Sequence, residues 1–120
     1  MFLALVAFGL LVAGPRCLAQ APSGEKISLR ILYVGKPGSA READFLAFLR
    51  QHFRQVKTGS LAGFNANAAG DTDVVLLDYD GDGFKAPRPN LPTSYAQPTV
   101  TIGVAGALLS RERGLKTGYT

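Results

Sequence analysis

The spacing of apolar residues along the chain predicts four β-strands. Residues Ile27–Val34 and Thr99–Val104 are rich in β-branched and large apolar side chains, which is typical of strands. The segment Asp73–Asp78 contains four consecutive apolar residues, as expected for a strand that is buried on both faces of a parallel sheet. A shorter and weaker strand is predicted over Gln55–Thr58.

Two helices are predicted from apolar residues at helical spacing. The first begins at Ser39, which forms a capping box with Glu42 and so satisfies the first free amides of the helix. Its apolar stripe contains Phe45, Leu46, Phe48, Leu49 and Phe53. The second helix covers Gly106–Arg113 and ends at Gly114, a residue type that commonly terminates helices. Between the two helices, Leu61–Ala69 lacks a strong stripe and is expected to form a short helix or a loop.

This order of elements predicts an α/β fold, namely a flavodoxin-like, three-layer parallel sheet with its strands in the order 2-1-3-4. Four strands are few for such a fold, and the last strand would be left as an open, apolar edge. We therefore expect the domain to be incomplete and to self-associate through this edge. The segment Tyr79–Pro98 contains four prolines and is expected to be an irregular loop that is either functional or disordered.

The N-terminal residues carry the pattern of a secretory signal. The apolar run Phe2–Gly14 is too short to span a bilayer, and Ala19-Gln20-Ala21 after it matches an A-x-A cleavage site. The basic residue that usually precedes such a run is missing. We expect residues 1–21 to be a signal peptide and residues 22–120 to be the domain. The mature protein would then be periplasmic or extracellular and would meet the membrane only during export.

Cleavage changes the chemistry open to the chain. It removes Arg16 and Cys17, the one cysteine, and leaves a net charge of +3, because one of the 13 basic residues is lost against 9 acidic residues. A chain without cysteine has no disulfide, no thiolate nucleophile and no cysteine-based metal site. The basic residues are dispersed and form no stripe interleaved with aromatic residues, so we do not expect nucleic acid to be a partner.

Three carboxylates follow the third predicted strand, at Asp78, Asp80 and Asp82. Ligands bind outside the carboxyl ends of the strands in open parallel sheets, so this turn lies where a site is expected, outside the core. The spacing matches the first half of a calcium-binding loop, but the twelfth position, which needs a Glu, is Pro89. A looser divalent-cation site and a solvated acidic turn both remain open.

A candidate anion site precedes the first predicted helix. Lys36, Gly38 and Ser39 place a cation, a glycine and a hydroxyl beside the free amides of the helix start. A turn followed by a helix cap explains the same residues, and the spacing matches neither a P-loop nor a dinucleotide fingerprint. The one histidine, His52, is distant in sequence from any nucleophile, so no catalytic triad can be nominated.

The segment Ile102–Leu115 resembles the nucleophile elbow and following helix of the class I glutamine amidotransferase-like superfamily. The resemblance extends more diffusely over residues 27–118, through the first strand, the first helix and the DVVLLD segment, and it implies a flavodoxin-like fold. Ala105 stands where this family has its cysteine, so its covalent chemistry is not implied. Ala105 and Gly106 are instead expected to face the ligand crevice. The pairing of GKPGS with LDYDGDGFKAPRP is also similar to a group of exported, uncharacterised bacterial proteins.

These observations lead to one functional hypothesis and one alternative. The first is an exported, non-catalytic amidotransferase-like domain that binds a small or anionic ligand, or a protein, at the carboxyl edge of its sheet. Its ligand-binding residues would be Lys36, Gly38, Ser39, Asp78, Asp80, Ala105 and Gly106. The alternative is a hydrolase that uses a divalent cation held by Asp78, Asp80 and Asp82. Whether the chain is an enzyme at all stays open, since no nucleophile or triad is recognised.

Overall fold

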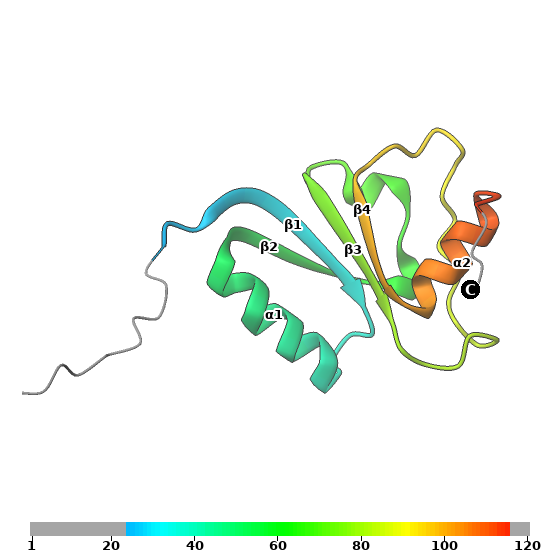
Figure 1. Ribbon diagram of the computed structural model, residues 1–120, viewed down its shortest axis with the longest axis horizontal. Coiled ribbons are helices and arrows are strands. Elements are labelled where there is room, and N and C mark those ends of the chain that lie inside the picture. The colour runs from blue at the N-terminus through cyan, green and yellow to red at the C-terminus, as the bar shows by residue number, and fades with distance from the viewer. Residues whose placement is uncertain (1–23, 116–120) are drawn as a thin grey trace, which may run out of the picture.

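Four parallel strands form one sheet in the computed structural model, which describes residues 24–115 (Figure 1). The strands are β1 (Ile27–Gly35), β2 (Phe53–Ser60), β3 (Val74–Tyr79) and β4 (Thr99–Gly103). Their order is β2-β1-β3-β4, and all three neighbouring pairs are parallel. The predicted α/β fold and strand order are therefore confirmed, in an arrangement consistent with a flavodoxin-like sheet. The predicted signal peptide lies outside the described residues.

Helix α1 (Ala40–His52) covers one face of the sheet, over β1 and β2 (Figure 1). Leu49 is buried there at 3% exposure with Ile31 and Tyr33 of β1, and Phe45, Leu46, Phe53, Val56, Val74 and Leu76 pack around them. Phe48 differs from the predicted stripe because it is 56% exposed, with its ring 4.7 Å from that of His52. The helix packs through a narrower stripe than the sequence indicates.

The chain enters β2 directly from the end of α1. The amide of Phe53 donates to the carbonyl of Leu49, so Phe53 both caps the helix and begins the strand. The prediction placed Phe53 in the helical stripe and began the strand at Gln55. Phe53 still packs on the α1 side of the sheet, which explains why its apolar character fitted a helical pattern.

The opposite face of the sheet carries the larger cluster of buried residues. Two short 3₁₀ helices, η1 (Leu61–Gly63) and η2 (Ala66–Ala69), and helix α2 (Val104–Glu112) lie on this side. The cluster consists of Leu32, Val34, Leu61, Phe64, Ala69, Val75, Leu77 and Ala105. The irregular segment Leu61–Ala69 was predicted as a short helix or loop, and it forms these two 3₁₀ turns. Among residues 24–115, no helix is long and apolar enough to cross a membrane.

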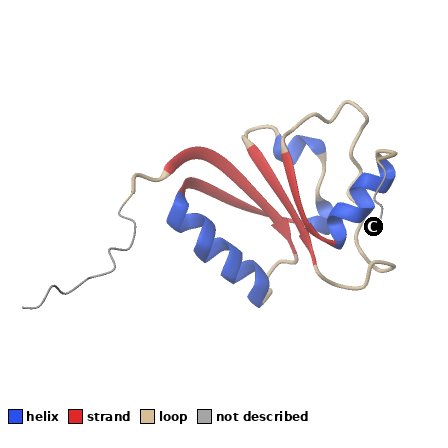
Figure 2. Ribbon diagram, in the orientation of Figure 1, coloured by secondary structure: helices blue, strands red, loops and turns tan. Residues whose placement is uncertain are grey.

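The segment 80–98, predicted as a functional or disordered loop, packs over this same face (Figure 2). Tyr95 lies edge-on to Phe64 with 6.5 Å between ring centroids, and its hydroxyl is 2.9 Å from that of Thr99. Arg113, just after α2, donates hydrogen bonds to the carbonyls of Pro92 and Thr93. The loop therefore covers the sheet where a crossover helix would usually lie between two parallel strands.

Candidate ligand-binding site

A crevice opens at the carboxyl ends of β1 and β3, where the chain leaves the sheet in opposite directions. After β1 the chain runs into α1 on one face, and after β3 it crosses the other face (Figure 1). Such a divergence is the topological switch point at which open α/β sheets bind ligands. A site is predicted from the sequence at the strand ends, and the structure places a cavity there.

The crevice has two parts, which share Lys36 and Tyr79. The Arg41 hollow, of about 240 Å³, is lined by residues that include Tyr33, Lys36, Ser39, Arg41, Asp78 and Asp80. The Lys85 hollow, of about 280 Å³, is lined by residues that include Lys36, Ser60, Leu61, Tyr79, Lys85 and Pro87. Four of the predicted ligand residues, namely Lys36, Ser39, Asp78 and Asp80, therefore come together in the first hollow.

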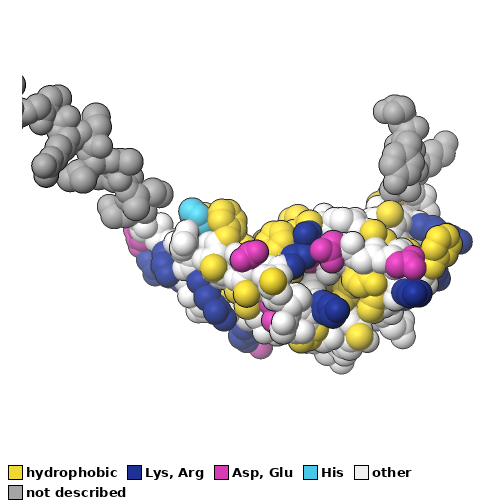
Figure 3. Space-filling view, turned by 90° about the horizontal axis from the view of Figure 1, so that it is seen from below, with side chains coloured by type: hydrophobic (Ala, Val, Ile, Leu, Met, Phe, Trp, Pro, Cys, Tyr) yellow, Lys and Arg dark blue, Asp and Glu magenta, His cyan; other side chains and the backbone are white. Residues whose placement is uncertain are grey.

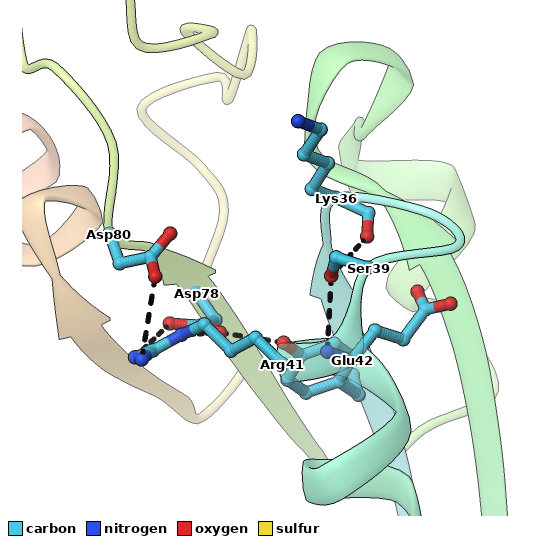
Figure 4. A network of polar contacts seen from close by, with 7 residues as sticks. Lys36, Ser39, Arg41, Glu42, Asp78 and Asp80 are labelled. Atoms are coloured by element: carbon cyan, nitrogen blue, oxygen red, sulfur yellow. Dashed lines mark hydrogen bonds and ion pairs between the residues drawn. The ribbon is translucent and has the colours of Figure 1, made fainter.

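Asp78 does not lie in a solvated turn but is buried, with 2% exposure, at the end of β3. Its carboxylate accepts hydrogen bonds of 2.7 and 2.9 Å from Nε and Nη2 of Arg41 and one of 2.6 Å from the hydroxyl of Tyr33 (Figure 4). The prediction that this carboxylate stays outside the core is wrong. A carboxylate can be buried when its charge is paired and its oxygens are hydrogen-bonded, and the two-pronged Arg41 contact provides both.

Aromatic packing holds Arg41 in place. Its guanidinium lies over the ring of Phe45, 5.3 Å from the centroid, and this ring stacks on Tyr33 at 5.4 Å. The hydrogen bond to Asp78 raises the pKa of Arg41, and burial, together with the bond to Asp78, raises the pKa of Tyr33. Near neutral pH, Tyr33 is therefore a protonated phenol and Arg41 a cation. Both groups therefore act as hydrogen-bond donors to Asp78.

Asp80 and Asp82 lie on the exposed side of this network. Asp80 is 3.7 Å from Nη1 of Arg41 and its side chain is 66% exposed. Asp82 is exposed, and its carboxylate accepts from the amide of Phe84 at 2.9 Å within the turn. Among residues 24–115, no three His, Cys, Asp or Glu side chains converge as a metal-binding group. The three carboxylates predicted as a cation site are thus used separately, and a cation at Asp78 would compete with Arg41.

The turn before α1 has the predicted capping box. The hydroxyl of Ser39 accepts from the amide of Glu42 at 3.1 Å and donates to the carbonyl of Lys36 at 2.8 Å. The Glu42 carboxylate accepts in return from the amide of Gly38, which adopts a positive φ of 73°. Glu42 therefore brings its own negative charge to the helix start, and Gly38 and Ser39 mainly shape the turn. The side chain of Lys36 points away from the Arg41–Asp78 pair (Figure 4).

Ala105 and Gly106 line neither part of the crevice. Ala105 is 6% exposed and belongs to the core cluster beneath α2, and Gly106 lies against the side chain of Thr101. The sharp turn between β4 and α2 occurs two residues earlier, at Gly103, with φ 68° and ψ −140°. A Cβ atom at Gly103 would lie 2.5 Å from the carbonyl oxygen of Tyr79. The apex of this turn thus has no room for a side chain of any kind.

The crevice residues that were not predicted from the sequence include Tyr33, Arg41, Tyr79 and Lys85. Two signals were available for three of them. Tyr33-Val34-Gly35 and Tyr79-Asp80-Gly81 both have a glycine two residues after a tyrosine, at the ends of neighbouring strands. In each case the tyrosine ring lies against the glycine, so that a Cβ atom on the glycine would be within 2.8 Å of the tyrosine hydroxyl. Arg41 stands in the first turn of a helix, where the dipole disfavours a cation, and this placement indicates an anionic partner. Lys85 had no such signal.

A scan against protein-family models finds no match, and searches of curated proteins and of solved structures find none either. The likeness to class I glutamine amidotransferases therefore stays a prediction from sequence.

Proposed function

We propose that this chain is an exported, non-catalytic domain of amidotransferase-like layout that binds a small or anionic ligand at the carboxyl edge of its sheet. The observation that carries the proposal is the crevice at the switch point between β1 and β3, with Lys36 in both of its parts. Lys36 is exposed and makes no ion pair with another residue in the described range 24–115. Its ammonium group is thus available to a ligand.

The electrostatics of the crevice favour a ligand of low negative charge. In the Arg41 hollow, Lys36 and Arg41 are balanced by Asp78 and Asp80. Arg41 is already committed to Asp78, so the charge that it offers a ligand is largely neutralised. A highly charged anion would meet Asp80 at the rim, whereas a small ligand with one acidic group can approach Lys36 and avoid it.

Two features support a binding role over a catalytic one. A nucleophile elbow needs a reactive side chain at the sharp turn between a strand and a helix. The sharp turn between β4 and α2 has Gly103 at its apex, and glycine has no reactive side chain. Asp78, the first acid of the proposed cation-dependent hydrolase, has its carboxylate engaged by Arg41 and Tyr33. No observation favours the hydrolase alternative.

Chemical-shift mapping by NMR tests the proposal. The ¹⁵N-labelled protein is titrated separately with acetate, inorganic phosphate and 2-naphthoate, three anions that differ in charge and apolar surface. We expect saturable shifts at the amides of crevice residues, among them Gly35, Lys36, Asp80, Gly81 and Lys85. Shifts spread over the whole surface, or none at all with any of the three anions, would contradict the proposal. Intact-mass analysis of the protein secreted by its host tests export, and a mature chain that begins near Pro22 is expected.

A further inference from the structure

The two parts of the crevice differ in the charges that line them. The Arg41 hollow contains two cations and two carboxylates. The Lys85 hollow contains Lys36 and Lys85, and none of its lining residues is acidic. Basic and acidic side chains are mixed over the face of the molecule in Figure 3. By contrast, the two charged residues that line the Lys85 hollow are both basic. An anionic group is therefore favoured in the Lys85 hollow more than in its neighbour.

The floor of the Lys85 hollow is apolar. Leu61 is 3% exposed, and half-buried Pro87 and Tyr79 line the same space. Leu61 belongs to the core cluster, and Tyr79 packs against that cluster, so this surface continues the core outward. An inorganic anion would leave it uncovered, whereas a ligand with an apolar body would remove it from water.

The chain around the hollow is held in a defined conformation. The amide of Lys85 donates to the carbonyl of Asp82 at 3.1 Å, which closes the turn before it. Ala86, the next residue, is buried at 8% exposure and holds the loop segment that leads to Pro87. The ends of β1 and β2 also line the hollow, at Gly35 and Ser60. These contacts fix the shape of the hollow, and small-molecule sites are usually largely preformed.

We infer that the Lys85 hollow binds the carboxylate of a small organic acid between Lys36 and Lys85, with the apolar body of the acid against Leu61, Pro87 and Tyr79. This inference rests on the proposed function and narrows it in two respects. It assigns the ligand to one of the two parts of the crevice, and it requires both an acidic group and an apolar body in the ligand.

A comparison of three probes by NMR titration tests the inference. 2-Naphthoate has both required features, 2-naphthamide lacks the charge, and acetate lacks the apolar body. We expect 2-naphthoate to bind more tightly than either, with its largest shifts at the amides of Gly35, Ser60, Ala62 and Lys85. Lys85→Gln should weaken 2-naphthoate binding by roughly two- to fivefold, the usual effect of losing one exposed ion pair. Lys57→Gln removes an exposed lysine of β2 that lines neither hollow, and it should leave the affinity unchanged.

The outcomes separate this inference from the proposed function. If 2-naphthamide binds as tightly as 2-naphthoate, or if Lys57→Gln weakens binding as much as Lys85→Gln, the inference is overturned. Shifts confined to Arg41, Asp78, Asp80 and Gly81 would also overturn it, while they would support the broader proposal of a ligand at the crevice. The absence of shifts in both hollows with all probes would contradict the two together.

Discussion

The hydroxyl of Tyr33 donates a 2.6 Å hydrogen bond to the carboxylate of Asp78, which lies 45 residues further along the chain on the neighbouring strand. Arg41 completes the pairing from the first turn of α1. These three residues join β1, α1 and β3 at the point where the crevice opens. The network therefore contributes to both the stability of this end of the sheet and the shape of the Arg41 hollow.

Asp78→Asn should destabilise the protein by about 1.5–3 kcal/mol, because a buried acceptor that is hydrogen-bonded to a charged group contributes about this much. The control is Asp80→Asn. The exposed Asp80 carboxylate lies 3.7 Å from Nη1 of Arg41, and exposed ion pairs of this kind contribute little to stability. Urea unfolding of both variants measures the difference. Equal, small effects of the two substitutions would show that the Asp78 network does not stabilise the fold.

Leu49→Ala should lower the free energy of unfolding by about 2–5 kcal/mol, the usual cost of truncating a buried leucine. Phe48→Ala is a matched control from the same helix, because Phe48 is 56% exposed and its loss should matter far less. Urea unfolding again provides the measurement. A larger cost for Phe48→Ala than for Leu49→Ala would mean that α1 packs through a different face.

Gly103→Ala should be more destabilising than Gly114→Ala. Both glycines have a positive φ, 68° and 65°, a sparsely populated backbone conformation that costs a residue with a Cβ about 1–3 kcal/mol. At Gly103 the new Cβ would also lie 2.5 Å from the carbonyl oxygen of Tyr79, whereas at Gly114 there is nothing within 4 Å. Thermal unfolding of the two variants compares the costs. Indistinguishable midpoints would argue against the close approach of β3 and β4 at this turn.

Asp73 should make stability depend on pH in the acid range. Two side-chain hydrogen bonds from Arg30, followed by one from its backbone amide, lower the pKa of Asp73 to about 2. The unfolded chain has the ordinary aspartate pKa of about 3.9, so the contribution is complete above that value and is lost as the pH falls toward 2. Asp73→Asn should therefore be less stable than the parent protein at pH 7 and lose this disadvantage between about pH 4 and 2.

Urea unfolding of Asp73→Asn at pH 7, 4, 3 and 2 measures this convergence. Asp71→Asn removes a carboxylate from the same loop but leaves the Arg30 bonds intact, which makes it the control. If the stability of Asp71→Asn converged with that of the parent protein at low pH as strongly as the stability of Asp73→Asn does, the pH dependence could not be assigned to the Asp73–Arg30 pair.

The sequence predicted the fold better than the site. The four apolar segments, the helical pattern after the first of them and the assumption of right-handed crossovers were sufficient for the strand order, because handedness leaves few alternatives. The burial of Asp78 could not be predicted in the same way, because it depends on Arg41 and Tyr33, which are distant in sequence and meet it only in the folded sheet. For the same reason Lys85 was missed, since a proline-rich loop gives no periodicity that would place its side chains.

The turn at Gly103 was located incorrectly for a different reason. The glycines at positions 103 and 106 flank Ala105, and the pattern alone does not tell which glycine adopts the strained conformation. The structure assigns it to Gly103, because β3 and β4 approach so closely there that only a glycine fits. The start of α2 consequently moves from the predicted Gly106 to Val104, and Ala105 turns into the core.

The most direct test of the account is the affinity of the parent protein and of Lys36→Gln for 2-naphthoate, because Lys36 lines both hollows. We predict that the variant keeps its fold and binds 2-naphthoate roughly two- to fivefold more weakly at low salt. The difference should shrink at 1 M salt, where exposed charges are screened within about 3 Å. Equal affinities of the two proteins at low salt would contradict the claim that this crevice binds an anionic ligand.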